Sequence, residues 1–398
     1  MKMDSIIVFG DSLSDIGKKW LTKSGKLARA TNQMYVSPSG RFSDCRNWTD
    51  FMIEEATGTK MIFESAEATV QLSAGFTSLS KTSHFEGTDS FYYANYAEGG
   101  ACGHTPASKG PFLGTFKDQV DAFSKDCSVV NEPLGNMLFI IWFGANDLYT
   151  AGCTATQMAT VAQEVATVQR DRLATLARTY GTAAVFIFVN LARPLTSVRY
   201  TMRLKKAERK LRELADPNVI ELQDMSGRFQ GNMEKADSAL DYDLYVNRGK
   251  KRSSAYEQLA KQVHEIKELE KGVVIFNAKL AELAAQNHDH VTEIDTCLSE
   301  EAISQLVESN NRLVWGASPA RATHVSSSSY DQASSSSSHT TTIDEVHPTD
   351  QVYKLIWHEI RKEIVKAGCT FGDGQGMTAS SSSPTQPQSP TEIEMTTL

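Results

Sequence analysis

Two runs of almost unbroken apolar residues restrict the fold of this chain most, at residues 137–143 (MLFIIWF) and 183–189 (AAVFIFV). A strand with one face in water alternates apolar and polar residues, whereas a run without alternation is typical of a strand covered on both faces. Residues 5–9 and 91–96 are two further strand candidates, and residues 273–276 (VVIF) are a shorter fifth one. The sequence therefore predicts a buried sheet of five strands.

Segments with helical spacing separate these strands. Residues 44–56, 156–180, 254–270 and 349–366 carry apolar side chains at intervals of three or four, which is the period of a helix with one buried face. Strands that alternate with helices favour a parallel sheet with helices on both of its faces. The predicted fold class is therefore α/β.

Three polar stretches interrupt this pattern. Residues 192–252 form a long polar stretch that begins with a basic amphipathic helix at residues 199–212. Residues 318–340 are rich in serine, and we expect a flexible loop there. Residues 370–398 are rich in Ser, Pro and Thr, so we expect a disordered tail. The remainder fits one large domain, residues 1–369, in which 192–252 is a basic helical insertion.

Composition excludes several classes of protein. The chain carries 40 basic and 48 acidic side chains, a net charge of −8. Nucleic-acid binding needs a basic surface that neutralises phosphates, so we expect no nucleic-acid partner. The six cysteines are scattered and form no CxxC pair, which argues against a zinc ribbon and against a disulfide scaffold.

The start of the chain bears on its location. The first apolar run spans only residues 6–9, whereas a secretory signal peptide needs about 7–15 apolar residues and a cleavage site. No apolar stretch approaches the ~18 residues of a membrane span. We therefore expect a soluble chain that is cytoplasmic as synthesised.

Four segments that lie far apart in the sequence combine into one chemical arrangement. Residues 9–15 (FGDSLSD), 95–101 (NYAEGGA) and 143–147 (FGAND) follow predicted strands, and residues 344–349 (DEVHPT) precede the last predicted helix. In open α/β sheets, ligands bind at the edge formed by the carboxyl ends of the strands. We expect the four segments to meet at that edge.

Together the segments contain the groups that an acyl transfer needs. A serine hydroxyl is a weak nucleophile, so Ser12 requires an adjacent base, which His347 can supply. Asp344 can orient the imidazole and stabilise its charged form. The oxyanion of a tetrahedral intermediate needs preorganised donors. Candidate donors are the backbone N–H groups of Ser12 and Gly100 and the side-chain amide of Asn146.

In order and content, the four segments resemble the sequence blocks of the GDSL (SGNH) family of lipases and esterases. The resemblance implies that Ser12 is the nucleophile and that Asp344 and His347 complete the catalytic triad. By the same resemblance, Ser12, Gly100 and Asn146 form the oxyanion hole. The implied fold is a flavodoxin-like α/β/α sandwich with a five-stranded parallel sheet, the SGNH hydrolase fold. No metal and no organic cofactor is implied.

Further segments resemble one branch of that family. Residues 40–43 (GRFS) followed by 48–51 (WTDF) look most like the branch that contains secreted phospholipases and glycerophospholipid:cholesterol acyltransferases. Two features depart from the branch. Residues 340–343 (TTTI) stand where an aromatic stretch usually precedes the catalytic Asp, and residues 192–252 are longer than a typical connection.

The resemblance implies a serine esterase that forms an acyl-enzyme on Ser12 and takes an acyl ester or a phospholipid as substrate. Phospholipase A or lysophospholipase activity is the main hypothesis. Water or an alcohol such as cholesterol could resolve the acyl-enzyme, because hydrolysis and acyl transfer use the same triad. Two alternatives stay open: a carbohydrate O-acetyl esterase, and a non-catalytic binding or scaffold protein with the same fold.

Several features leave partners and location open. Residues 199–212, from Arg199 to Arg212, contain seven basic side chains and one acid, Glu208. This helix is either a solvated face or a peripheral contact with anionic lipid, where each basic residue contributes about 1 kcal/mol. An unknown protein partner could activate the enzyme by ordering the Ser-rich loop beside Asp344. The branch also includes effectors that bacteria inject into host cells, so such export stands beside a plain cytoplasmic location.

Two smaller features have a chemical and a structural interpretation. His288, Asp289 and His290 could bind a metal ion, although such a polar run is more often a solvated loop. Asp15 could orient the loop that carries Ser12, and we expect a structural hydrogen bond there.

Overall fold

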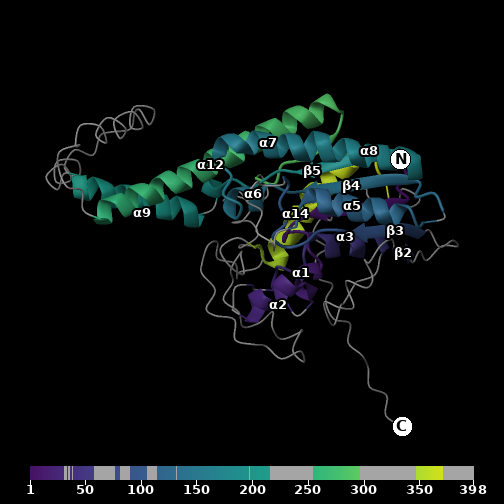
Figure 1. The fold of residues 1–398 in the computed structure, drawn as a ribbon, viewed down its shortest axis with the longest axis horizontal. Coiled ribbons are helices and arrows are strands. Elements are labelled where there is room, and N and C mark those ends of the chain that lie inside the picture. The colour runs from purple at the N-terminus through teal and green to yellow at the C-terminus, as the bar shows by residue number, and fades with distance from the viewer. Residues whose placement is uncertain are drawn as a thin grey trace, which may run out of the picture.

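The structure is a computed structural model that describes residues 1–30, 34, 36–37, 39–57, 77–80, 90–104, 114–130, 132–196, 198–215, 254–295 and 347–370 (Figure 1). Asp344, the Ser-rich segment 318–340 and the tail from residue 371 lie outside these described residues. So do residues 216–252, the larger part of the 192–252 stretch. The expected domain boundaries, the flexible loop and the disordered tail therefore stay predictions.

A six-stranded sheet forms the centre of the fold, in the order β2-β3-β1-β4-β5-β6. Strands β3, β1, β4, β5 and β6 run parallel to one another, and the edge strand β2 runs antiparallel to β3. Among the parallel strands, the first in the chain lies between the second and the third, which is the flavodoxin-like order. The predicted five-stranded parallel sheet is confirmed, with one antiparallel strand added. The strands are β1 (Ser5–Gly10), β2 (Thr77–Ser80), β3 (Ser90–Asn95), β4 (Asn136–Trp142), β5 (Ala183–Val189) and β6 (His290–Thr292).

The prediction of a strand at residues 273–276 is wrong, because these residues lie inside helix α12 (Ser254–Gln286). Val273 and Phe276 are fully buried, whereas Val274 is 43% exposed, so only one face of the segment is covered. A strand inside the sheet would have both faces covered. The fifth parallel strand is the short β6, which pairs with the carboxyl end of β5.

Helices pack on both faces of the sheet and confirm the α/β/α sandwich. On one side α3 packs against α14, where Trp357 donates its indole N–H to Glu55 at 2.9 Å. On the other side α5 packs against α8. The helices are α1 (Lys18–Leu21), α2 (Lys23–Ala30), α3 (Trp48–Thr57), α5 (Phe116–Cys127), α6 (Ala145–Tyr149), α7 (Met158–Gln163), α8 (Arg170–Tyr180), α9 (Val198–Ala215), α12 (Ser254–Gln286) and α14 (Asp350–Lys366), with 3₁₀ turns η1 (Ala155–Gln157) and η3 (Pro194–Thr196) and one π-helical turn, η2 (Glu164–Gln169).

Helix limits follow local capping more than apolar spacing. The helix predicted over residues 44–56 begins only at Trp48, because Asn47 precedes it and accepts the N–H of Thr49 at 3.0 Å. The helix predicted over 254–270 continues to Gln286. The basic helix predicted over 199–212 is confirmed as α9.

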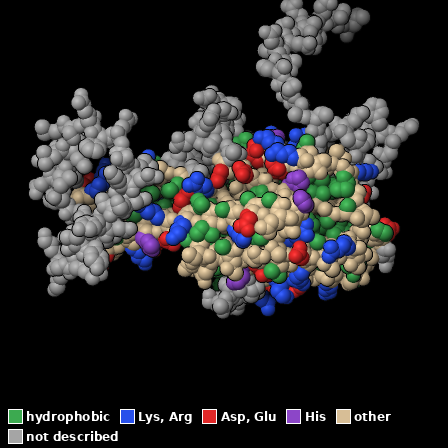
Figure 2. All heavy atoms as spheres, turned by 90° about the horizontal axis from the view of Figure 1, so that it is seen from above, with side chains coloured by type: hydrophobic (Ala, Val, Ile, Leu, Met, Phe, Trp, Pro, Cys, Tyr) green, Lys and Arg blue, Asp and Glu red, His purple; other side chains and the backbone are tan. Residues whose placement is uncertain are grey.

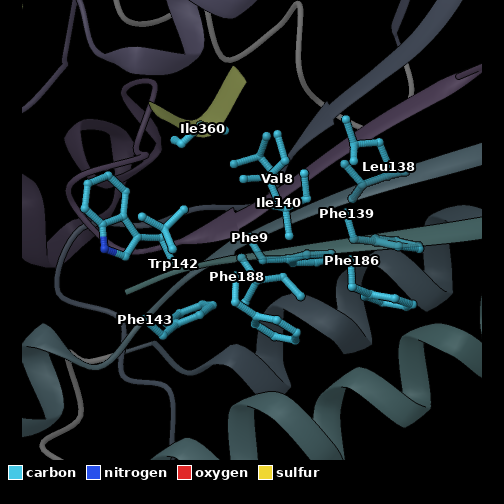
Figure 3. Close-up of a cluster of buried hydrophobic side chains, with 14 of the residues drawn as sticks. Val8, Phe9, Leu138, Phe139, Ile140, Trp142, Phe143, Phe186, Phe188 and Ile360 are labelled. Carbon is cyan, nitrogen blue, oxygen red and sulfur yellow. The ribbon is translucent and has the colours of Figure 1, made fainter. Parts of the chain in front are cut away.

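Alternate residues of the strands point to opposite faces, which explains why both faces are apolar. In Figure 3, Val8 lies on the side of Ile360 from α14, whereas Phe9 and Phe139 lie on the other side. Phe9 contacts Phe123 of α5 edge-on, with ring centroids 5.8 Å apart. Burial of these aromatic rings supplies much of the hydrophobic stabilisation of the fold.

The surface is mixed in charge. Figure 2 shows Lys and Arg side chains interspersed with Asp and Glu over the face that it presents. In the part of the chain that the structure describes, no helix is both long enough and apolar enough to cross a membrane.

Gly144 joins β4 to α6 in a backbone conformation that other residues avoid. Its φ is 118° and its ψ is −26°. A Cβ atom at this position would lie 2.9 Å from Cζ of Phe276 and 3.1 Å from Cδ1 of Leu191. Both the dihedral angles and the close packing of α12 therefore require glycine here.

We predict that Gly144→Ala lowers the free energy of unfolding by about 2–4 kcal/mol, because it adds backbone strain and an overlap with the ring of Phe276. The matched control is Gly152→Ala, since Gly152 has a φ of 72° and a Cβ atom there would meet nothing within 4 Å. Gly152→Ala should lower the free energy of unfolding by about 1 kcal/mol, because the left-handed backbone conformation is its one source of strain. Urea unfolding of both variants measures the difference, and equal costs would contradict the role given to α12 packing.

Candidate active site

The candidate nucleophile and the candidate base meet at the carboxyl edge of the sheet. Ser12 lies two residues after the end of β1, and His347 lies three residues before α14. Nε2 of His347 is 2.7 Å from Oγ of Ser12, although 335 positions separate the two residues in the chain. An imidazole at this distance can take the hydroxyl proton, which is what activates a serine as a nucleophile.

Two backbone N–H groups beside this pair donate to no acceptor among the described residues. They belong to Ser12 and to Gly100. Gly100 has a φ of 83°, in the left-handed region that favours glycine. Unpaired N–H groups next to a nucleophile are the donors that an oxyanion hole requires.

The side-chain amide of Asn146, in the first turn of α6, is the third candidate donor. Its Nδ2 donates to the carbonyl of Ala101 at 3.2 Å and to Oδ2 of Asp11 at 3.3 Å. Its Oδ1 accepts the hydroxyl of Thr150 at 3.1 Å, which orients the nitrogen toward the other two loops. Both bonds from Nδ2 are long, so the amide can still turn a hydrogen toward a developing oxyanion.

The structure therefore brings Ser12, His347, Gly100 and Asn146 to one edge of the sheet. Asp344 lies outside the described residues, so its place beside His347 stays a prediction.

Buried Asp15 ties the loop that carries Gly100 to the loop that carries Ser12. Oδ2 of Asp15 accepts the N–H of Gly99 at 2.7 Å, and Oδ1 accepts the N–H of Gly17 at 2.8 Å. Burial raises the pKa of this carboxyl, and the backbone N–H groups around it act in the opposite direction. Asp15 thus has the structural role that the sequence indicated.

Two further buried side chains join the same loops. Asp147 accepts the N–H of Gly103 at 2.7 Å and that of His104 at 3.0 Å, which connects α6 to the loop after β3. Gln119 of α5 holds Gly10 at both polar atoms, with its amide donating to the carbonyl at 2.8 Å and accepting the N–H at 3.1 Å. The end of β1 and the loops around it are therefore fixed by Asp15 from the loop after β1 and by side chains from α5 and α6.

Asp11, the neighbour of Ser12, is a buried carboxyl at the centre of the site. Burial raises its pKa to about 7, while the N–H of Leu13 and the nearby His347 act to lower it. Oδ1 accepts the N–H of Leu13 at 3.0 Å, and Oδ2 accepts the amide of Asn146. Asp11 thus positions the amide that we consider an oxyanion donor.

The ring of Phe42 lies against the imidazole of His347. The two ring centroids are 4.9 Å apart, and the planes are tilted by 34°. A Cβ atom at Gly99 would lie 2.6 Å from the same phenyl ring, so glycine is needed there for Phe42 to approach. The phenol of Tyr353 in α14 donates to the carbonyl of Phe42 at 3.2 Å. Phe42 therefore limits the tilt of the imidazole.

No three His, Cys, Asp or Glu side chains gather as a metal site would require, within the residues that the structure describes. In the 288–290 segment, the carboxylate of Asp289 binds the guanidinium of Arg170 through two hydrogen bonds, at 2.8 and 2.9 Å. The Asp289 carboxylate of that segment is thus engaged in a contact with Arg170 of α8.

Sequence reasoning assigns no role to Asp11, Phe42 or Gln119. Asp11 and Phe42 lie inside the segments 9–15 and 40–43, which resemble family blocks, so their position in the sequence could have marked them as site residues. Gln119 lies on an amphipathic helix and carries no such signal, because its contact with Gly10 appears only when α5 packs against β1.

We predict that Asp11→Asn flattens the dependence of stability on pH. The carboxyl has a pKa of about 7 in the folded chain and 3.8 as its ordinary value, so between these pH values it is ionised in the unfolded chain and takes up a proton on folding. Stability from this group is therefore present below pH 4 and lost as the pH rises to 7. As the pH rises from 4 to 7, the free energy of unfolding of the variant should increase relative to that of the wild type by up to about 4 kcal/mol.

Urea unfolding at several pH values measures this gain. Asp171→Asn is the reference, since the Asp171 side chain is 61% exposed. A constant difference between Asp11→Asn and the wild type at every pH would contradict the buried-carboxyl explanation.

We predict that Phe42→Ala slows phosphonylation of Ser12 by a fluorophosphonate roughly tenfold, because the imidazole loses the ring that limits its tilt, and a positioned base contributes 10²- to 10⁴-fold. Phe42→Leu should slow the phosphonylation less, because leucine still fills part of the space beside the imidazole. Phe123→Leu truncates a ring in the core, away from His347, and serves as the stability control. If Phe123→Leu slows labelling as much as Phe42→Leu does, the effect belongs to general stability instead.

Comparison with solved structures finds several of low sequence identity. A member of the lipolytic G-D-S-L family from Veillonella parvula is 13% identical, with 92% of this chain and 100% of that chain covered and a TM-score of 0.33. A carbohydrate acetylesterase from Sinorhizobium meliloti is 14% identical, with 91% and 99% covered and a TM-score of 0.37. A phospholipase A1 from Streptomyces albidoflavus is 10% identical, with 91% and 99% covered and a TM-score of 0.31.

No curated protein matches the chain. The sequence model of the GDSL-like lipase/acylhydrolase family matches residues 6–360, which includes every segment of the candidate site. The chain therefore belongs to the GDSL-like lipase/acylhydrolase family and is an ester hydrolase of the GDSL type.

Proposed function

We propose that this protein is a serine lipid-ester hydrolase, a phospholipase A or lysophospholipase, with Ser12 as nucleophile and His347 as general base. The observation that carries the proposal is the 2.7 Å approach of Nε2 of His347 to Oγ of Ser12 at the carboxyl edge of the sheet. Within an ester hydrolase family, this pair is the chemical centre that an acyl-enzyme mechanism needs.

In the first step, Oγ of Ser12 attacks the ester carbonyl while its proton passes to Nε2 of His347. The carbonyl oxygen becomes an oxyanion that accepts hydrogen bonds from the N–H groups of Ser12 and Gly100 and from the amide of Asn146. The first two donors have no described acceptor to give up, so they need little reorganisation. We assign Asp344 to orient the imidazolium.

In the second half, the imidazolium gives its proton to the departing alcohol oxygen, and Ser12 keeps the acyl group as an ester. Water then attacks the acyl-enzyme while His347 again takes a proton, and the fatty acid leaves as Ser12 regains its hydrogen. An alcohol in place of water would give acyl transfer by the same steps. The triad is common to both outcomes, so the choice depends on which acceptor reaches the acyl-enzyme.

The preference for lipid esters rests on the segment at residues 40–43, which resembles the phospholipase and acyltransferase branch. Phe42 of this segment lies against His347. Arg41 is buried, donates to Asp50 at 3.0 Å and holds the carbonyl of Ile16 at 3.0 Å. The branch-like segment is thus anchored directly at the site, which supports carrying the activity of the branch over to this chain.

The test is mass spectrometry of lipids after incubation of the protein with phospholipid vesicles that contain cholesterol. We expect free fatty acid and lysophospholipid from the wild type. Ser12→Ala should lower the rate by 10³-fold or more, because it removes the nucleophile. Ser128→Ala, a surface serine at the end of α5 whose hydroxyl donates to the backbone, is the matched control and should behave as the wild type.

Three results would replace the proposal. Cholesteryl ester as the main product would make the protein an acyltransferase. Strict preference for acetate over longer acyl groups in nitrophenyl esters would make it an O-acetyl esterase. Equal cellular effects of the wild type and Ser12→Ala would favour a non-catalytic binding role.

A further inference from the structure

Two helices form an arm that extends from the body of the molecule (Figure 1). We call α9 together with residues 254–269 of α12 the arm. Its helices pack through a small apolar cluster that is separate from the main core. The buried members of the cluster are Ala207, Leu211 and Val263, and the partly buried ones are Leu204, Tyr256, Leu259 and Ala260.

The face of α9 opposite this cluster is basic. Lys205, Lys206 and Lys210 are exposed and form no ion pair with any described residue. The acidic side chains of the helix are already engaged, because Glu208 pairs with Lys267 at 3.3 Å and Glu213 pairs with Arg209 at 3.6 Å. The arm therefore carries a concentrated positive face on a chain whose net charge is −8.

An exposed apolar residue lies within this basic face. Met202 is 65% exposed, and it precedes Lys205 and Lys206 by three and four residues, which places the three side chains together on one face of the helix. An apolar side chain surrounded by lysines suits the boundary between lipid headgroups and acyl chains. No aromatic side chain on which nucleic-acid bases could stack lies within four residues of Lys205, Lys206 or Lys210 in α9, and Tyr200, the aromatic residue of the helix, is half-buried.

The arm is joined firmly to the candidate active site. Beyond the arm, α12 packs on α6, where a Cβ atom at Gly272 would lie 2.8 Å from Leu148. Further along, Phe276 packs against Gly144, in the turn that leads to Asn146. At its base, Glu270 accepts hydrogen bonds from Nε of Arg193 at 2.5 Å and from the N–H of Leu195 at 3.0 Å. Binding at the arm would therefore set the orientation of the catalytic edge.

We propose that the arm docks the enzyme on membranes that contain anionic phospholipid, through the basic face of α9 with Met202 at its centre. This inference rests on the proposed lipid-ester function, because docking brings the catalytic edge to a surface that holds its substrate. Each exposed lysine near an anionic membrane strengthens binding roughly fivefold. A negatively charged protein without such a face would be repelled by the same membrane.

The experiment measures flotation of the full chain with vesicles of phosphatidylcholine alone or with phosphatidylserine. All proteins carry Ser12→Ala, so that products do not accumulate. We expect binding only with phosphatidylserine, with weakening as salt is raised. Neutralising the exposed lysines of α9 should weaken this binding about a hundredfold. The arm variant combines Lys205→Gln, Lys206→Gln and Lys210→Gln, and the control, equal in charge, combines Lys117→Gln, Lys362→Gln and Lys366→Gln on helices of the body, where these side chains are 55%, 62% and 67% exposed.

Equal loss of binding in the arm variant and in the control would overturn the proposal, because net charge alone would then explain the effect. Unchanged binding of the arm variant would overturn it too, as would binding of the parent Ser12→Ala protein to acidic protein or nucleic acid but not to vesicles. Thermal unfolding confirms that both triple variants are folded. The lipid-ester function is tested apart from this, by hydrolysis of a short-chain phospholipid in free solution by the wild type, so docking without hydrolysis would overturn only the function.

Discussion

Buried carboxylates bind the loops at the carboxyl edge of the sheet to one another, and the geometry of the site depends on them. Asp15 and Asp147 accept backbone N–H groups from the loop after β3, and Asp11 accepts one from its own loop. Taking a carboxyl out of water is costly, which is why burial raises the pKa of all three. The hydrogen bonds from the N–H groups offset that cost. They also hold the loops after β1, β3 and β4 at fixed distances, whereas the parallel strands alone would only bring these loops near one another. Ser12 and Gly100 can then leave their own N–H groups without a described protein acceptor.

The sequence predicts the parts of this architecture that depend on local or short-range patterns. The runs at 137–143 and 183–189 are recognisable because both of their faces are covered, and they form β4 and β5. The loops after β1 and β3, the turn at Asn146 and His347 are recognisable because each resembles a family block. The rule that parallel strands end at a common edge then predicts that these segments meet, and the contact between Ser12 and His347 agrees with it.

Patterns that depend on long-range packing escape the same reasoning. The run at 273–276 resembles a strand because valine and isoleucine favour strands, but it continues the helical spacing of Val263 and Ile266, and α12 buries one face of it against the body. Asp11 and Phe42 acquire their roles from Asn146 and His347, which are more than a hundred residues away. Gln119 reaches Gly10 only because α5 lies across β1.

Helix α12 connects the arm to the part of the body that carries Asn146. A strand at residues 273–276 would have ended the preceding helix near residue 270, and the arm would then be tied to the body only through a loop. Because the helix runs unbroken to Gln286, the side chains that pack on α9 and those that pack on Gly144 and Leu148 belong to one rigid element. A long helix curves gently, but a sharp kink usually needs a proline or an inserted group, and α12 contains no proline. The position of the arm relative to Asn146 is therefore a property of the fold, set by the close approach at Gly272 and the ring of Phe276.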